Sequence, residues 1–470
     1  MINLKLKKFQ HDIKGKRVAV IGIGISNIPA IEYLTKLGAR VTALDKKEAL
    51  GEECKRLQYL GVEFILGEHY LSKLSNYDYI LRSPGIKPFL PEIEEAVAKG
   101  VKLISEVELV AALAPCKVIG VTGSDGKTTT TTLIAKFLEK AGYHVWLGGN
   151  IGTPLFTKLD EMQDTDIVVL ELSSFQLMTL RERINIAVVT NISPNHLDYH
   201  RSYGEYILAK ANIFLHQQKE DIVVFNQDDK QTKDYIDLLE NNHVRTHIRE
   251  FSMVEEVKKG VYLQEDNIVS NVAGEEEFVA KIVDVKLVGI HNLANICAAA
   301  SAVIDMTGIE PIREVISTFQ GVEHRMEFVR EVDGVKWYND SIGTSPTRTI
   351  AGLVSFRQKI ILIAGGYDKN IPYDEIGEYI LNKVKALILM GKTAPKIEEA
   401  VRQEAERQDL VLEEVMDMVH CNHLEECVKQ ASKLAKEGDI VVLSPASASF
   451  DLYKNFEERG NHFKALVEAL

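Results

Sequence analysis

Two hydrophobic patterns alternate along this chain, one typical of buried strands and the other of amphipathic helices. Short continuous apolar runs, such as VAVI at 18–21 and IILIA at 360–364, have the length of strands buried on both faces. Between such runs lie segments with apolar residues three and four positions apart, which is the spacing of amphipathic helices. The alternation predicts an α/β fold with mostly parallel sheets.

Glycine-rich turns follow three of the strand-like runs, within RVAVIGIGIS (17–26), KVIGVTGSDGKT (117–128) and KIILIAGGYDKN (359–370). A length of 470 residues also suggests about three domains. We predict a Rossmann-like domain at 1–105, a central P-loop domain with a mostly parallel sheet at 106–320, and a second Rossmann-like domain at 321–470.

Composition excludes several classes of protein. The formal charge of -13 and the lack of a basic stretch argue against a nucleic-acid partner. Five cysteines, odd in number and without a CxxC pair, indicate a reducing compartment. The first residues lack the apolar core of a signal peptide, and no apolar run approaches the roughly 18 residues of a membrane span. We therefore expect a soluble cytoplasmic protein with no membrane partner.

The segment TGSDGKT at 122–128 stands between an apolar strand and a helix, where a glycine-rich turn wraps phosphates. Lys127 would reach the outer phosphates and Thr128 would bind magnesium. Val121 stands where the general motif has glycine, so the loop is a shortened variant. The alternative is a glycine turn with a solvated lysine. The residues expected to bind ATP here are Gly123, Ser124, Asp125, Gly126, Lys127, Thr128 and Thr129.

Three residues near the ends of later strands are candidates for metal binding. Glu171 follows the apolar run IVVL, where a carboxylate can become a second magnesium ligand. His196 follows another strand and is either a cation ligand or a surface hydrogen-bonding group. Lys210 lies on one helical stripe with apolar residues. It either snorkels to solvent, or burial lowers its pKa so that the amine binds carbon dioxide as a carbamate, an anionic ligand for a second magnesium.

The first glycine-rich turn is close to a dinucleotide fingerprint, with Asp45 ending the next strand and Asn27 replacing the third glycine. A NAD-dependent dehydrogenase is therefore one interpretation. A second phosphate loop with magnesium ligands disfavours it, and a Rossmann-like domain that binds UDP fits better. A regulatory nucleotide switch is a third interpretation, but it leaves the last domain unexplained.

Six segments together resemble the Mur ligases, which add amino acids to the peptidoglycan precursor, and the resemblance spans essentially the whole chain. The DNPR motif of the diaminopimelate-adding branch is absent, and the last segment is similar to the signature of the D-glutamate-adding branch. The segments are TGSDGKTT (122–129), LELSSFQL (170–177), NISPNHLDYH (191–200), YILAKANIF (206–214), GIHNLANICAAASA (289–302) and LSPASASFDLYKNFEERGNHF (443–463).

The resemblance implies an ATP-dependent ligase with two Mg²⁺ sites and an acyl-phosphate intermediate. One Mg²⁺ would bind Thr128 and Glu171, and the other His196 and carbamylated Lys210. Asn292 and Asn295 would approach the nucleotide. Arg325 and Asp340 would close over ATP from the third domain, with a hinge near Gly321. The residues implied in catalysis are Lys127, His196, Lys210, Arg325 and Asp340.

The substrates implied by the resemblance are UDP-N-acetylmuramoyl-L-alanine and D-glutamate, bound by a monomer. The implied contacts of the nucleotide sugar are Ser26, Asp45, Ser83, Gly85, Asn150 and Ser173. Those of D-glutamate are Thr344, Lys369, Ser449 and Phe456. One departure concerns Ile342, which replaces a lysine that helps to hold glutamate in relatives. Either Lys369 alone or another cation then binds the glutamate side chain.

Overall fold

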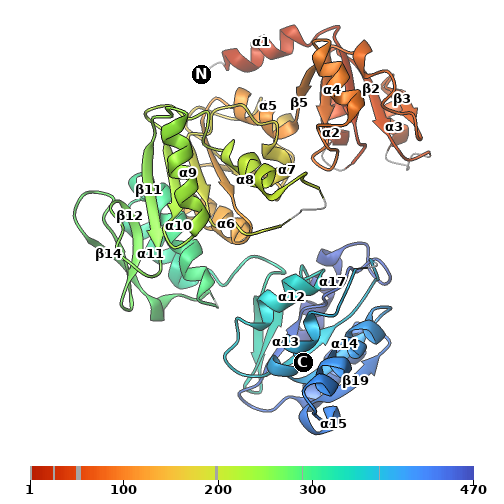
Figure 1. Cartoon of the computed structure of the whole chain (residues 1–470), viewed down its shortest axis with the longest axis vertical. Coiled ribbons are helices and arrows are strands. Elements are labelled where there is room, and N and C mark those ends of the chain that lie inside the picture. Colours follow the sequence, from red (N-terminus) through yellow and green to blue (C-terminus); the bar gives the residue numbers. More distant parts are fainter. Residues whose placement is uncertain (1–2, 25–26, 49–53, 196–198, 288, 370) are drawn as a thin grey trace. The chain divides into compact units, whose positions relative to one another are not determined.

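The structure is a computed structural model that describes residues 3–24, 27–48, 54–195, 199–287, 289–369 and 371–470, without the side chains of residues 233 and 240. The chain forms two compact units, shown in Figure 1. The first comprises Met1–Asp284 with Leu293–Ser317, and the second comprises Val285–Asn292 with Thr318–Leu470. The domain boundaries predicted at 105 and 320 stay a prediction.

The first sheet of unit 1 is parallel and has the strand order β3-β2-β1-β4-β5, so the first strand lies at its centre. This order is that of a Rossmann-like half, as expected. Its strands are β1 (Arg17–Ile21), β2 (Arg40–Asp45), β3 (Glu63–Leu66), β4 (Tyr79–Arg82) and β5 (Lys102–Ile104). Its helices are α1 (Leu4–Asp12), α2 (Asn27–Lys36), α3 (Lys55–Tyr59) and α4 (Pro91–Ala98), with the 3-10 turn η2 (Leu74–Asn76).

The second sheet of unit 1 has the order β14-β13-β12-β11-β10-β9-β6-β8-β7 and is parallel from β7 to β12. Only the β12, β13 and β14 pairings are antiparallel among those that the structure describes. The strands are β6 (Lys117–Thr122), β7 (Val145–Gly149), β8 (Ile167–Glu171), β9 (Ile186–Val189), β10 (Ile222–Asn226), β11 (His247–Ser252), β12 (Gly260–Gln264), β13 (Asn267–Ser270) and β14 (Glu277–Lys281).

The remaining helices of unit 1 belong to the region of the second sheet. Helix α6 packs on β6 and β8. The helices are α5 (Glu106–Leu113), α6 (Lys127–Lys140), α7 (Ser174–Leu177), α8 (Tyr203–Ala211), α9 (Lys230–Asn241), α10 (His291–Thr307) and α11 (Ile309–Thr318), with the 3-10 turns η3 (Phe156–Lys158) and η4 (Ile282–Asp284). The small-residue segment expected to be helical is α10.

The sheet of unit 2 has the order β15-β16-β20-β17-β18-β19, with only the pairing of β15 and β16 antiparallel in the part that the structure describes. Its strands are β15 (Glu327–Val332), β16 (Val335–Asn339), β17 (Ile360–Ala364), β18 (Val384–Met390), β19 (Asp417–Cys421) and β20 (Ile440–Leu443). Its helices are α12 (Pro346–Leu353), α13 (Ile376–Lys383), α14 (Ala394–Arg407), α15 (Leu412–Val415), α16 (Leu424–Leu434) and α17 (Phe456–Glu468).

Burial on both faces explains the continuous apolar runs. In β17, Ile360 and Leu362 point into a core with α12, α13 and α14, whereas Ile361 and Ile363 point into a core with α16 and α17. Successive side chains of a strand lie on opposite faces, so a strand covered by helices on both sides needs an apolar residue at every position. The period-2 polar alternation of a half-exposed sheet is therefore absent from β17.

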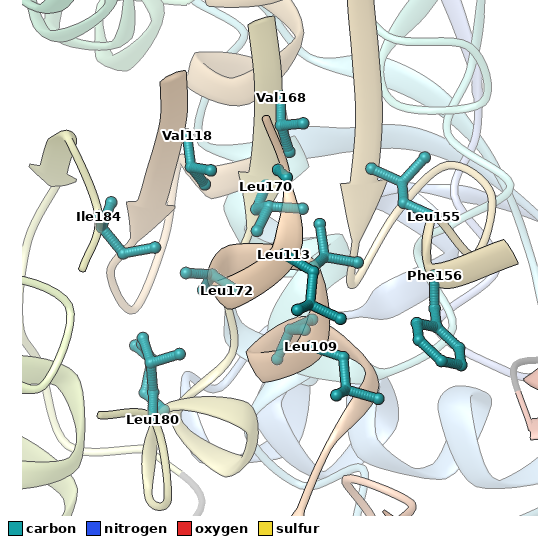
Figure 2. Packing of buried hydrophobic residues seen from close by; sticks show 14 of the residues in the cluster. Leu109, Leu113, Val118, Leu155, Phe156, Val168, Leu170, Leu172, Leu180 and Ile184 are labelled. Atoms are coloured by element: carbon teal, nitrogen blue, oxygen red, sulfur yellow. The ribbon is translucent and has the colours of Figure 1, made fainter. Parts of the chain in front are cut away.

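One apolar core joins the first sheet to the second. Side chains of α1 and α2 belong to the same cluster as those of α5, β6 and β8, part of which is shown in Figure 2. Phe156 is fully buried there and makes edge-to-face contacts with Phe9 and Tyr33, at centroid distances of 5.9 and 5.1 Å. These two aromatic pairs fix η3 against the helices of the first domain.

We expect Phe156→Ala to destabilise unit 1 by about 3–5 kcal/mol, because it removes a buried ring and leaves a cavity between the two sheets. Scanning calorimetry would show a lower unfolding temperature. The matched control is Phe450→Ala in unit 2, whose side chain is 62% exposed and should change stability little. Equal effects of the two substitutions would contradict this account of the core.

Candidate active site

The loop between β6 and α6 has the backbone conformation that phosphate binding needs. Gly126 precedes the helix with φ of 77°, and no side chain caps the helix start. A Cβ on Gly126 would overlap the Asn295 side chain, and one on Gly123 would overlap the Thr190 hydroxyl. Glycine is thus required for both conformation and space, and the first amides of α6 remain oriented toward a bound anion.

Two lysines of the predicted site meet at one carbonyl oxygen. Lys127 donates to the Gly123 carbonyl at 2.9 Å and to that of Ser124 at 2.8 Å, so its amine folds over the loop. Lys210, from α8, donates to the same Gly123 carbonyl at 2.7 Å and to the Thr122 hydroxyl at 3.3 Å. The helix of Lys210 and the phosphate loop are therefore parts of one site.

Lys210 does not snorkel, since only 2% of it is exposed. Burial holds the pKa of its amine well below the ordinary value, and the nearby charge of Lys127 lowers that pKa further. The Tyr206 ring lies 4.8 Å from the Lys210 nitrogen. The snorkelling alternative is excluded, and a lysine with a depressed pKa is the chemical condition that carbamate formation needs.

Glu171 ends β8 next to β6 and is buried. Its Oε1 accepts a hydrogen bond from the Asn150 amide at 2.8 Å, while Oε2 has no protein donor within the described part of the chain. A buried carboxylate oxygen that no protein group satisfies is suited to a metal ion or a water bound to one. Glu171 thus has the chemistry expected of a magnesium ligand, and Asn150 orients its carboxylate; the role of Thr128 stays a prediction.

The loop after β9 holds the phosphate loop in place, which sequence analysis missed. Asn191 accepts from the Asp125 amide at 3.0 Å, and its own backbone carbonyl accepts from the Ser124 amide at 2.9 Å. The Thr190 hydroxyl donates to the Asp125 carbonyl at 2.5 Å. A polar Thr-Asn pair directly after an apolar strand was the signal that could have indicated this role.

Four further predicted residues of the central region lie on or next to α6, α7 and α10. Asn295 of α10 contacts α6 through the Thr130 hydroxyl, at 3.3 Å. Ser173 caps α7 by accepting from the Gln176 amide. Asn292 lies in the first turn of α10, and Thr129 is buried in the first turn of α6. His196 lies outside the described residues.

Two of the candidate nucleotide-sugar residues, Asp45 and Ser83, lie beside the turn after β1. Asp45 accepts from the Ile23 amide at 2.8 Å, which holds the turn after β1. Asn27 donates to the Gly22 carbonyl at 2.7 Å and so replaces the missing third glycine as a contact of the turn. The Ser83 amide donates to the Ile21 carbonyl at 3.0 Å, and Ser83 begins the turn that contains Gly85. Ser26 lies outside the described residues.

In unit 2, Asp340 is buried after β16. Its carboxylate accepts from the Ser444 hydroxyl at 2.6 Å and from the Met326 amide at 3.2 Å. Burial raises the pKa of Asp340 to about 6, although the Ser444 hydrogen bond and the charge of Arg325 lower it in part. The charge of Arg325 is therefore close enough to act on Asp340, and the role of both residues at ATP stays a prediction.

The candidate D-glutamate residues all lie in unit 2. Lys369 donates to the Thr344 carbonyl at 3.5 Å. Burial lowers its pKa, and the charges of Arg348 and Arg459 lower it further. Ser449 is buried, and the carbonyl of Phe456 accepts from the Ser341 hydroxyl at 2.7 Å.

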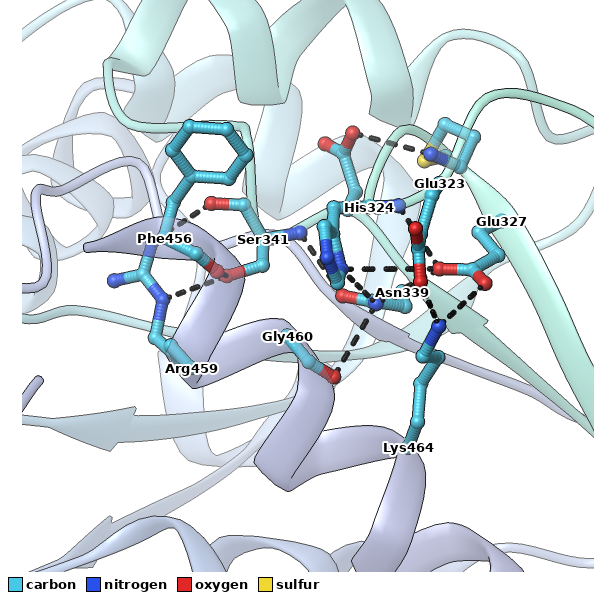
Figure 3. A network of polar contacts seen from close by, with 11 residues as sticks. Glu323, His324, Glu327, Asn339, Ser341, Phe456, Arg459, Gly460 and Lys464 are labelled. Carbon is cyan, nitrogen blue, oxygen red and sulfur yellow. Dashed lines mark hydrogen bonds and ion pairs between the residues drawn. The ribbon is translucent and has the colours of Figure 1, made fainter. Parts of the chain in front are cut away.

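A buried network that sequence analysis missed shapes this region (Figure 3). Arg459 is fully buried and donates to the Ser341 carbonyl at 2.7 Å and to that of Ser447 at 3.1 Å. Burial lowers its pKa to about 10. Asn339 donates to His324 at 2.9 Å and to Glu327 at 3.0 Å. These contacts fix the 341–345 and 447–449 segments, on which Thr344 and Ser449 stand.

The fold and this site define a P-loop nucleotide-binding α/β protein, and comparison with known proteins defines it further. The MurD-like N-terminal domain model of the Mur ligases matches residues 16–105, the Mur ligase middle domain model matches 121–303, and the Mur ligase glutamate ligase domain model matches 324–447. The chain belongs to the Mur ligase family, whose members are ATP-dependent ligases of peptidoglycan precursor synthesis. A dehydrogenase and a bare nucleotide switch are thereby excluded.

Two relatives are each 50% identical to this chain, and each alignment spans 100% of both chains. They are the UDP-N-acetylmuramoylalanine--D-glutamate ligases of Acetivibrio thermocellus and Ruminiclostridium cellulolyticum. Among solved structures, the UDP-N-acetylmuramate-alanine ligase of Thermotoga maritima has a TM-score of 0.56 at 17% identity, covering 97% of this chain and 99% of that one. This likeness shows the fold alone. The described helices include none that is long and apolar enough to cross a membrane.

The raised pKa of Asp340 predicts a pH dependence of stability. An acid whose pKa is higher in the folded protein binds more protons when folded, so the free energy of unfolding falls as pH rises from about 4 to about 6. We expect this fall to be about 3 kcal/mol larger in the wild type than in Asp340→Asn. Urea unfolding would be followed in a Trp146→Phe background, where Trp337 of β16 is the only tryptophan. Parallel pH profiles would show that Asp340 titrates near its ordinary value.

Proposed function

We propose that this chain joins the amino group of D-glutamate to the carboxylate of UDP-N-acetylmuramoyl-L-alanine at the expense of ATP. The observation that supports the substrates is the 50% identity, over the whole length, to ligases with that name. Such identity extends through unit 2, where the candidate amino-acid residues lie. We further propose that the enzyme acts as a cytoplasmic monomer, with no nucleic-acid or membrane partner.

The chain's own residues would offset the repulsion between the anions that must meet. The donor carboxylate attacks the γ-phosphorus of ATP, the bond to ADP breaks, and an acyl phosphate forms. Lys127 would release the Gly123 and Ser124 carbonyls and turn to the phosphates, while the amides at the start of α6 bind the same anion. Bound magnesium would neutralise developing charge and align the attacking and leaving oxygens.

The second step forms the amide. The amine of D-glutamate attacks the acyl carbon and phosphate leaves, while a base accepts the proton that the amine loses, for which His196 is our candidate. Thr344, Lys369, Ser449 and Phe456 are the proposed contacts of D-glutamate. Because Ile342 supplies no charge, Lys369 would bind the glutamate side chain.

We propose that Lys210 binds carbon dioxide. Its uncharged amine attacks the carbon of the gas, a C–N bond forms and one proton leaves, giving a carbamate with two anionic oxygens. The carbamate and His196 would then hold one Mg²⁺, while Thr128 and Glu171 hold the other. The depressed pKa of Lys210 and the nearby cation Lys127 both favour this anion.

The activity is tested by ADP release in the presence of Mg-ATP, UDP-N-acetylmuramoyl-L-alanine and a panel of amino acids. We expect D-glutamate to be the one that turns over, and ADP release to require both donor and amine. Turnover with another amino acid, or with none, would contradict the proposal.

Two variants control this assay. Lys127→Ala should release ADP at least 100-fold more slowly, because the outer phosphates lose their cation, yet bind the nucleotide sugar nearly as well. Lys117→Ala, an exposed lysine at the other end of the same strand β6, should retain full activity. Loss of nucleotide-sugar binding in Lys127→Ala would indicate a structural role for Lys127.

We expect Lys210→Ala to be nearly inactive and to regain part of its activity with acetate or formate, which can occupy the place of the carbamate. The gain should be absent from Lys127→Ala under the same conditions, because a small acid does not replace an ammonium group. Native mass spectrometry of the wild type in bicarbonate should show an added carbon dioxide. An unmodified lysine together with no restoration would contradict the carbamate.

A further inference from the structure

Arg82, the last residue of β4, links the first domain to the second sheet within unit 1. It is almost fully buried. One nitrogen of its guanidinium donates to the Ile86 carbonyl at 2.6 Å and to that of Pro84 at 3.3 Å. The other nitrogen donates to the Phe175 carbonyl of α7 at 3.0 Å. A single planar group thus fixes the 83–86 turn to α7.

Tyr199 holds the same turn from the other side. Its hydroxyl lies 2.9 Å from the Pro84 carbonyl and 3.1 Å from the Ile86 carbonyl. Its ring packs on Phe175, with centroids 4.0 Å apart. The two carbonyls of the turn are therefore held by both a guanidinium and a phenol.

Cation–π contacts extend the junction to the surface. The Arg201 guanidinium lies 4.1 Å from the Phe89 ring, and Lys87 lies 5.3 Å from the Tyr199 ring. Lys87 and Phe89 follow the 83–86 turn, and their partners are Tyr199 and Arg201. The 83–89 segment is therefore attached along its length to the 199–201 segment.

The burial of Arg82 is costly, which indicates that its geometry matters. Desolvation lowers the pKa of Arg82, and the negative charge of Glu108 raises it only in part. One carboxylate oxygen of Glu108 has no hydrogen-bond partner in the described structure. A buried arginine without a bidentate carboxylate contributes little net stability. Its planar fork does supply two donors in fixed directions, which a lysine cannot do.

The two sides of this junction belong to different halves of the proposed reaction. The 83–86 turn contains Ser83 and Gly85, the candidate contacts of the nucleotide sugar. Helix α7 begins three residues after Glu171, the candidate metal ligand. The distance between the bound nucleotide sugar and the metal ligand Glu171 therefore depends on how the 83–86 turn is attached to α7.

We propose that Arg82 and Tyr199 are positioning residues that hold the 83–86 turn at the distance from the Glu171 strand end at which the donor carboxylate meets the γ-phosphate. This inference rests on the proposed function. A displacement of about 1 Å between reacting groups can cost roughly 100-fold in rate, so a small loosening of the junction would reduce turnover without affecting ATP binding.

The test uses Arg82→Lys, which keeps the charge and loses the fork, and Tyr199→Phe, which keeps the ring and loses the hydroxyl. We expect kcat/KM for UDP-N-acetylmuramoyl-L-alanine to fall roughly 10- to 100-fold in Arg82→Lys and less in Tyr199→Phe. KM for ATP should stay within twofold of the wild type. Hydrogen exchange should become faster in the 83–86 and 174–179 segments of both variants.

The matched control is Tyr235→Phe, which removes a buried hydroxyl of α9 that donates to the Ile207 carbonyl at 2.7 Å; neither residue belongs to the 83–89, 174–179 or 199–201 segments. It should lose stability without a change in donor kinetics or in exchange at 83–86. Donor kinetics within twofold of the wild type in both junction variants would overturn the proposal, even if exchange rises. So would a rise in KM for ATP as large as the loss in kcat/KM for the donor. Wild-type enzyme that does not turn over the donor with D-glutamate would instead refute the proposed function.

Discussion

The active site depends on the Gly123 carbonyl oxygen, which accepts hydrogen bonds from two lysine amines at the end of β6. One of these groups, Lys127, is next to the phosphate loop in sequence, and the other, Lys210, comes from α8. The charge of Lys127, which also lowers the pKa of Lys210, favours an anion nearby, and so does the start of α6, where no side chain caps the helix. The Glu171 oxygen that has no protein donor in the described structure favours a cation. The site is thus prepared for a phosphate and a metal together.

Buried polar groups orient each of the segments that present candidate site residues. Thr190 and Asn191 hold the phosphate loop, Arg82 and Tyr199 hold the 83–86 turn, and Arg459 holds the 341–345 and 447–449 segments. Each of these contacts satisfies backbone carbonyls or amides that no helix or strand ladder satisfies. Irregular segments can be fixed in this way only when a side chain from elsewhere supplies the missing donor or acceptor.

The sequence alone was sufficient to predict the fold class and the phosphate loop, because both depend on local patterns. A strand buried on both faces needs an apolar run such as IILIA, and a phosphate loop needs glycines where Gly123 and Gly126 stand, since a side chain would overlap Thr190 or Asn295. The Mur ligase family was also recognisable from short motifs that keep their order along the chain. The network around Arg459 was not predictable, since an arginine in an amphipathic helix is usually exposed.

For Lys210 the sequence left two alternatives, and the tertiary structure excluded the one in which its amine reaches solvent. A lysine on an apolar helical stripe has the same local pattern whether its amine reaches solvent or faces a buried loop. The choice depends on the depth at which α8 packs against β6, and this depth is set by residues far away in the chain, among them Thr122. Local patterns determine which elements form and which residues are chemically able to act, whereas long-range packing determines which of those residues meet and what their pKa values become.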